Sequence, residues 1–207
     1  MSSPGSDVAA QLGEAVKHYF RSFVSLDPTK LKKQLSEVSY EQRIAIIQLH
    51  YRSSGEWTPV KKAAFRGHSE IVTALLTSLK EEDRMNVLGD CETPLHWASE
   101  EGHTDTVTAI LECLTLEQQL KLISTRDNCG RTAIHWASQK GHTETVQSNL
   151  NYLSPQQQLE LISVQNKYCK TPIQLAFSER HADTECLLRE CQLRAEYALN
   201  AKKRGKL

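Results

Sequence analysis

The sequence predicts an all-α protein, a solenoid of short helices built from repeats of just under 40 residues. The clearest sign is the segment Thr93–His103, whose sequence TPLHWASEEGH returns almost intact as TAIHWASQKGH at Thr132–His142. Weaker copies stand at Thr58–His68 and Thr171–His181, and the four initial threonines lie 35, 39 and 39 residues apart. Self-similarity at such a period is typical of stacked-repeat proteins, in which each unit buries its apolar face against its neighbours.

Length and composition narrow the class of protein. A chain of 207 residues is long enough for one domain or a short solenoid, and its 25 basic and 25 acidic residues give no net field toward nucleic acid or membranes. No apolar run approaches the ~20 residues that span a bilayer, and residues 1–7 lack the features of a signal peptide. Six cysteines without a C-x-x-C favour a reduced intracellular compartment. We expect a cytoplasmic location, with the nucleus as the alternative.

The N-terminal region lacks the Thr-Pro motif. We expect residues 1–6 to be disordered and residues 7–50 to form a helical cap and the first linker. Apolar residues recur at helical spacing from Val8, with Asp7 as the N-cap, and a second helix is predicted at Thr29–Val38. Such a pair of helices would cover the apolar end that a stack of repeats leaves open.

Each repeat is predicted to hold two helices. Thr93 can cap the first helix and Pro94 can occupy its first position, where no amide donor is needed. Leu95 and Ala98 supply its buried stripe. Gly102 ends it where a left-handed residue is required, and a second helix follows.

The residues T-P-L-H, a following alanine and G-H hold fixed offsets in two nearly intact copies. By these residues the chain resembles the ankyrin-repeat family over about residues 55–191. The resemblance implies four repeats within residues 51–191, at about 55–88, 89–127, 128–166 and 167–191. The last copy is degenerate, because Arg180 replaces the glycine, and residues 192–207 are expected to be a helix end and a basic tail.

The linkers between repeats are longer than usual. The common ankyrin period is 33 residues, and here two repeats run six residues longer. The added segments share one pattern, found at Thr115–Ile123 and Ser154–Ile162, at Ser39–Ile47 and more faintly at Lys80–Leu88. Ser154 and Gln157 form the start of a capping box. We therefore predict extended, partly helical linkers, with a short helix in each docked by an apolar edge such as Leu120 and Ile123.

No catalytic motif is present. The phosphate-binding, dinucleotide-binding, nucleophile-elbow and H-E-x-x-H patterns are all missing from the sequence. We expect no enzymatic activity and no cofactor. Pairs of histidines seven residues apart, such as His96 and His103, suit metal ligation no better than they suit a helix and its turn. In the resembled family the first histidine bonds the turn between repeats and the second lies at the helix corner, so no metal is expected.

Three cysteines lie just before the motif threonines, at the turns between repeats. Cys91 and Cys169 occupy the position that Gly130 holds in the third copy, and Cys129 is its neighbour. Equivalent positions of stacked repeats are roughly 8–10 Å apart, beyond the ~7 Å that a disulfide allows between α-carbons. We interpret these cysteines as tolerated turn residues.

The resemblance implies an intracellular scaffold or adaptor that binds another protein in the concave groove formed by the turns and the first helices. No nucleic-acid or membrane partner is expected, and the chain is expected to be monomeric. In the family the variable positions precede the threonine and the G-H pair. Carried over, they are Trp57, Phe65, Arg66, Asp90, Glu92, Glu100, Glu101, Asn128, Arg131, Gln139, Lys140, Tyr168, Lys170 and Glu179. Trp57 stands out as an aromatic anchor, whereas Trp97 and Trp136 are expected to be packing residues.

The charges of this surface change sign along the repeats. The second repeat is acidic through Glu92, Glu100 and their neighbours, and the third and fourth are basic through Arg131, Lys140 and Lys170. We predict a dipolar groove. Three alternatives remain open: a nuclear regulatory cofactor that binds a transcription-related partner and carries KKRGK at 202–206 as its signal, an enzyme whose site follows no known motif, and a relative or fragment of a larger receptor or channel.

Overall fold

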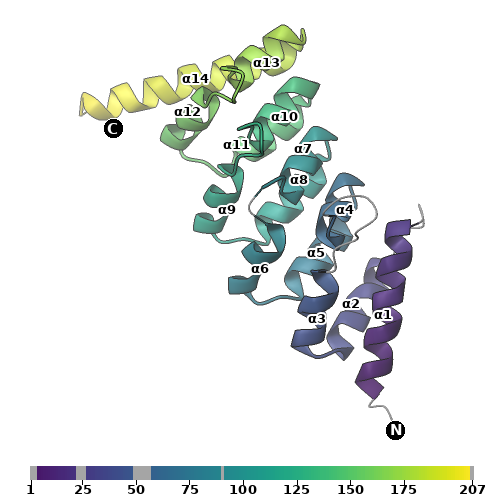
Figure 1. The fold of residues 1–207 in the computed structure, drawn as a ribbon. Helices are drawn as coiled ribbons and strands as arrows, with labels where there is room; N and C mark the ends of the chain where they lie inside the picture. The colour runs from purple at the N-terminus through teal and green to yellow at the C-terminus, as the bar shows by residue number, and fades with distance from the viewer. Residues whose placement is uncertain (1–3, 22–26, 49–56, 90, 206–207) are drawn as a thin grey trace.

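The computed structural model describes residues 4–21, 27–48, 57–89 and 91–205. In these ranges the chain forms fourteen helices and no strand (Figure 1). The predicted all-α class is therefore confirmed. In chain order the helices are α1 (Pro4–Arg21), α2 (Pro28–Glu37), α3 (Tyr40–Ile47), α4 (Pro59–Phe65), α5 (Ser69–Thr77), α6 (Glu81–Leu88), α7 (Pro94–Glu100), α8 (Thr104–Glu112), α9 (Leu116–Ile123), α10 (Ala133–Lys140), α11 (Thr143–Leu150), α12 (Pro155–Ser163), α13 (Pro172–Ser178) and α14 (Ala182–Lys203).

The helices stack in rows. The first helices α4, α7, α10 and α13 pack one on the next, and the second helices α5, α8, α11 and α14 do the same. At the N-terminal end α1 packs on α4 and α2 on α5, so both rows continue through this unit. The short helices α3, α6, α9 and α12 stand along one side of the stack (Figure 1). Each complete unit thus has three helices, one more than the two of the basic motif.

The motif residues form the helix ends that the sequence predicts. Thr58, Thr93, Thr132 and Thr171 are the N-caps of the first helices. The first three copies end these helices at Gly67, Gly102 and Gly141, with φ of 71°, 74° and 77°. In the last copy Arg180 has φ 64°, so a residue with a Cβ occupies the left-handed position there.

The third helices are docked by an apolar edge, as predicted. Thr115 opens α9 with a complete capping box. Ile123 is fully buried and Leu120 is partly buried against the core, as predicted for this edge, and Leu122 is buried with them. The helix also turns the amide of Gln119 inward, where it donates to the carbonyls that end the preceding second helix.

Arg84 occupies in α6 the position that Gln119 occupies in α9, and it also donates to carbonyls at the end of the preceding second helix. Its guanidinium donates to the carbonyls of Leu76 and Leu79 at the end of the preceding helix, and it also reaches the carbonyl of Cys113 in the next repeat, 2.6 Å away. A glutamine is too short to make that third bond. We call the row formed by α3, α6, α9 and α12 the sidewall. In the N-terminal half of the stack, Arg84 therefore ties the sidewall to the next repeat.

Two predictions for the chain ends need correction. Residues 4–6 belong to α1, so the predicted disorder of residues 1–6 is wrong there, and residues 1–3 lie outside the described residues. Asp7 is in the first turn of α1 and is not its N-cap. Proline is tolerated in a first turn because its missing N–H would have no partner there, and an acidic residue nearby favours the same end.

At the C-terminal end α14 runs to Lys203, so the helix includes the start of the predicted basic tail. In the described part of the chain no helix is long and apolar enough to cross a membrane.

Candidate interaction surface

The first histidine of the motif ties each first helix to the following turn. His96 Nδ1 accepts a hydrogen bond from the Thr93 amide, 3.1 Å away. Because that nitrogen is an acceptor, the proton of the neutral ring is on Nε2, which donates to the carbonyl of Arg131 in the next repeat at 3.1 Å. His135 repeats the arrangement and donates to the carbonyl of Val164. Burial lowers the pKa of both histidines, that of His135 to about 4.

The second histidine of the motif reaches in the opposite direction. His103, His142 and His181 each direct Nε2 at a carbonyl near the end of the preceding first helix, at 3.0–3.1 Å. The acceptors are the carbonyls of Phe65, Glu100 and Gln139, three of the predicted groove residues. The backbone beneath the predicted groove is thus fixed from both sides. Within the described ranges, no group of three or more metal-binding side chains comes together.

An aromatic cluster lies at the start of the stack and consists of Trp57, Phe65, Trp97 and, above them, Lys62. The ring centroids are 4.7 Å apart for Trp57 and Trp97, 5.3 Å for Trp57 and Phe65, and 6.0 Å for Phe65 and Trp97. All four side chains are half-buried. The Lys62 ammonium lies 5.2 Å from the centre of the Trp57 ring and 5.7 Å from that of Phe65. Burial, together with nearby Arg66, lowers the pKa of Lys62.

Trp97 was expected to be a packing residue, and it packs on Trp57 and Phe65 while its side chain stays half-buried. A helical period places Trp97 about 200° around the helix from the buried Leu95. From this angle, the sequence could have indicated that Trp97 is not fully buried. Lys62 was missed altogether, although it occupies in the first repeat the position that Trp97 holds in the second.

The turn before α10 is organised by a buried carboxylate. Asp127 accepts from the amides of Cys129 and Arg131 at 2.8 Å, from Arg131 Nε at 2.9 Å and from Trp136 Nε1 at 3.1 Å. The guanidinium of Arg131 lies 3.5 Å from the centre of the Trp136 ring. Burial acts to raise the pKa of Asp127, but the bonds and charge of Arg131 outweigh it and hold the pKa below its usual value. Arg131 is therefore already engaged by its own repeat.

The next turn uses an amide in place of the carboxylate. Asn166 accepts from the amides of Tyr168 and Lys170 at 2.9 and 3.1 Å, and the Lys167 amide donates to the Cys129 carbonyl of the turn before. Tyr168 is left 68% exposed at the tip.

The cysteines of the turns behave differently from one another. Cys169 takes φ 57° in the place of Gly130, as its alignment predicts. Cys91 does not, because in that turn the left-handed residue is Glu92, with φ 36°. The Cys91 thiol lies 3.3 Å from the side-chain oxygen of Asn128, so neighbouring turns touch through these positions.

Charges on the presumed groove are partly paired. Lys140 Nζ lies 3.4 Å from a carboxylate oxygen of Glu100 across the two first helices. Arg131 is likewise paired with Asp127. These charges of the predicted dipole are therefore neutralised within the protein. Among the described residues, Glu92, Glu101, Lys170 and Glu179 remain exposed and outside any ion pair.

Comparison with known families decides what this stack is. One family model, described as ankyrin repeats in three copies, matches residues 9–121, and a second, described as ankyrin repeats in many copies, matches residues 95–148. The chain belongs to the ankyrin-repeat family. In a comparison with curated proteins, none matched the chain. Ankyrin repeats are generally protein–protein interaction modules.

The match begins inside α1, so it covers helices that lack the Thr-Pro motif. Because the match starts at residue 9, the ankyrin pattern extends into the unit of α1 and α2, which continues both rows of helices. The division into a cap at residues 7–50 and four repeats stays a prediction.

The residues carried over from the family lie along two lines of this ankyrin stack, and we refer to both lines together as the front surface. Asp90 lies outside the described residues. The turn line holds Trp57, Glu92, Asn128, Arg131, Tyr168 and Lys170, and the line of first-helix ends holds Phe65, Arg66, Glu100, Glu101, Gln139, Lys140 and Glu179. Trp57 and Phe65 from the two lines meet in the aromatic cluster. The use of these residues in binding stays a prediction.

Proposed function

We propose that this ankyrin-repeat protein is a non-enzymatic adaptor that binds a partner protein through its front surface. The observation that carries the proposal is the aromatic cluster. Half-exposed aromatic side chains that pack on one another supply large contact area with little loss of side-chain freedom, and such residues dominate the energetics of many interfaces. Lys62 above the rings adds a cation that an acidic or carbonyl-rich partner segment would accept.

The rigidity of the front surface supports the same proposal. Each histidine bond joins two repeats, so the turns and first-helix ends are held before a partner arrives. A surface that is ordered in advance loses less entropy on binding. The exposed charges at Glu92, Glu101 and Lys170 surround the anchors with a polar rim, as interfaces generally have.

The state of the cysteines favours binding over catalysis. Burial raises the pKa of Cys113 and Cys191, and the negative charge of Glu190 raises that of Cys186. A catalytic thiol needs a lowered pKa, because the thiolate is the nucleophile. The buried histidines His96 and His135 use both ring nitrogens in structural bonds. We further propose that the adaptor works in the cytoplasm.

The proposal is tested by quantitative affinity capture from cells that express the protein. The test variant carries Phe65→Ala and Trp97→Ala, which remove two rings of the cluster. The matched control carries Leu193→Ala and Tyr197→Ala, which remove two exposed apolar side chains from α14. Proteins that the unaltered chain captures should fall at least about tenfold with the test variant, a loss of ~1.4 kcal/mol, and stay with the control.

Circular dichroism must show that both variants remain folded at the capture temperature. Equal capture by the test variant and the unaltered chain would show that the partner does not use the aromatic cluster, and the proposed front surface would be wrong.

A further inference from the structure

Three of the second helices on the other side of the stack, α5, α8 and α11, carry acidic residues and no basic ones. Across the whole of α5, α8 and α11 there are four carboxylates, at Glu70, Asp105, Glu112 and Glu144, and no lysine or arginine. The chain as a whole has equal numbers of acidic and basic residues. The middle of this row is therefore an acidic face of a neutral protein, and α2 and α14, which flank it, carry basic residues.

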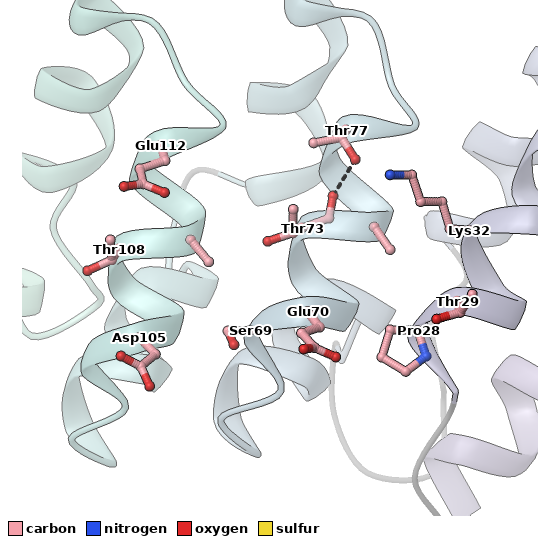
Figure 2. Close-up of a pocket in the computed structure, with 12 residues that line it drawn as sticks. Pro28, Thr29, Lys32, Ser69, Glu70, Thr73, Thr77, Asp105, Thr108 and Glu112 are labelled. Carbon is pink, nitrogen blue, oxygen red and sulfur yellow. Dashed lines mark hydrogen bonds between the residues drawn. The ribbon is translucent and has the colours of Figure 1, made fainter.

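A groove of about 590 Å³ opens on this face between α2, α5 and α8 (Figure 2). Three of the carboxylates line it, Glu70 on α5 and Asp105 and Glu112 on α8, and we call it the acidic groove. Alanines at 74 and 109 leave room between the helices, and the threonine hydroxyls of α5 and α8 line the same space. One cation, Lys32, lines it from α2. Figure 2 shows Asp105 and Glu112 at the two ends of α8, with Lys32 on the far side of the groove.

These three carboxylates have no cation of their own. Within the described ranges the ion pairs join other residues, and none involves Glu70, Asp105 or Glu112. By contrast, both carboxylate oxygens of Asp127 accept hydrogen bonds from Arg131 of the same turn. Glu70 and Asp105 lie in the first turns of α5 and α8, where a negative charge stabilises the helix end, but no cation among the described residues neutralises them. The groove therefore keeps a net negative charge.

A second observation points to the same place. Hydroxyls link neighbouring second helices: Thr104 lies 2.7 Å from Thr145, and Thr143 lies 2.7 Å from Thr184. The equivalent link between Ser69 and Thr106 is not formed, and Thr106 Oγ1 is fully buried with no hydrogen-bond partner in the described structure. Thr106 lines a smaller hollow of about 300 Å³ that shares Asp105 with the acidic groove, and Ser69 lines the groove itself. The Thr106 hydroxyl, which can both donate and accept, is thus left without a partner beside Asp105 at the junction of α5 and α8.

We propose that the acidic groove is a second docking site, which binds an arginine- or lysine-rich segment of a partner protein. Asp105 and Glu112 are seven residues apart on one helix, or about 10 Å along its axis. A segment in the polyproline II conformation has three residues per turn and rises about 3.1 Å per residue, so side chains three positions apart share a face and are about 9 Å apart. Basic side chains at every third position would therefore reach both carboxylates. Nucleic acid is disfavoured by its own negative charge.

The test uses the full chain and labelled peptides in fluorescence anisotropy at 50 mM and 500 mM salt. The probe is a nine-residue alanine peptide with arginine at every third position. A peptide with glutamate in those positions is the comparison. The arginine peptide should bind at low salt and lose most of its affinity at high salt, because exposed charges are screened over roughly 10 Å or less.

Two variants distinguish binding in the acidic groove from non-specific electrostatic attraction to the protein. Asp105→Asn with Glu112→Gln should weaken binding about tenfold, whereas the matched pair Glu117→Gln with Glu160→Gln, on α9 and α12, should leave it nearly unchanged. Thr73→Tyr fills the groove without altering charge, since the Thr73 side chain is exposed and lines it. That variant should weaken binding at low salt by at least fivefold.

Three results would overturn the proposal: no binding of the arginine peptide at 50 mM salt, an equal loss from both carboxylate pairs, or unchanged binding with Thr73→Tyr. The last two would reduce the effect to long-range attraction. Melting curves establish that each variant is folded, and if the Asp105 pair is not, Thr73→Tyr and Glu70→Gln decide the matter alone.

Discussion

His103 directs its Nε2 at the carbonyl of Phe65, 3.1 Å away in the preceding repeat, and its ring lies against Gly67 of that repeat. A Cβ on Gly67 would come within 2.7 Å of His103 Nδ1. The two residues of the G-H motif thus work between repeats: the glycine of one makes room for the histidine of the next. Arg180 can replace the glycine in the last copy because no described residue presses on it from a following repeat.

This relationship predicts that two glycines with the same backbone conformation differ in tolerance. Gly102 has φ 74° and Gly130 has φ 72°, so alanine pays similar backbone strain at each. A Cβ at Gly102 would meet His142 at 2.6 Å, whereas at Gly130 the nearest atoms are an Arg126 nitrogen at 3.2 Å and the Lys167 backbone nitrogen at 3.3 Å. Gly130→Ala should cost about 1 kcal/mol of unfolding free energy and Gly102→Ala about 2 kcal/mol more, measured by urea unfolding.

The cause of that difference can be isolated. Adding His142→Ala to Gly102→Ala removes the clash and should make the double variant lose less than the sum of the two single changes. Strict additivity would show that the histidine does not rest on the glycine.

The buried histidines predict a loss of stability in acid. The pKa of His135 is about 4 in the folded chain, against about 6.5 when unfolded. The folded pKa is the lower one, so His135 contributes stability above pH 6.5 that is lost as the pH falls toward 4. The loss between pH 7 and pH 5 should be about 2 kcal/mol for this residue.

His135→Gln separates this effect from general acid sensitivity. Gln174 already caps α13 in the same position, accepting from the Thr171 amide at 3.0 Å, so glutamine is compatible with the turn. The variant should be less stable at pH 7, because the bond to Val164 is lost, but its unfolding free energy should fall less between pH 7 and pH 5. Parallel curves for the two proteins over that range would contradict the assignment of His135 as a buried neutral ring.

The contact of Arg84 with the Cys113 carbonyl predicts that the stabilities of the first two repeats are coupled. Arg84→Gln should keep the bonds to Leu76 and Leu79, as Gln119 shows for its own repeat, and lose the bond to Cys113. The expected cost is about 1–2 kcal/mol, with faster amide exchange in α4 to α6 than in α10 to α12. Arg189→Gln, which breaks only an exposed pair on α14, should change stability by about 0.5 kcal/mol or less. Equal effects of the two changes would show that Arg84 does not join the repeats.

The sequence was most informative where structure is local. Caps at Thr93 and Thr132, the left-handed Gly102 and the capping box of α9 depend on residues a few positions apart, and all were predictable. The position of the short helices followed from four copies of one pattern.

Contacts between repeats were harder to predict. Nothing near Glu100 indicates Lys140, which comes from the next first helix of the stack, 40 residues away. Trp57 and Trp97 also lie 40 residues apart, and their contact depends on how α4 and α7 pack together. A pattern within one repeat does not include such neighbours, whereas Asp127 and Arg131 lie four residues apart in one turn.

The central claim, that a partner protein binds the front surface, is tested most directly by site-specific photo-crosslinking in cells that express the protein. A benzoyl-phenylalanine at position 101 places the reactive group among the exposed first-helix ends, and the same residue at position 117 places it on the exposed side of α9. The account predicts discrete covalent adducts with a second protein from position 101 and none from position 117. Adducts from position 117 alone would contradict it and would assign partner binding to the short third helices.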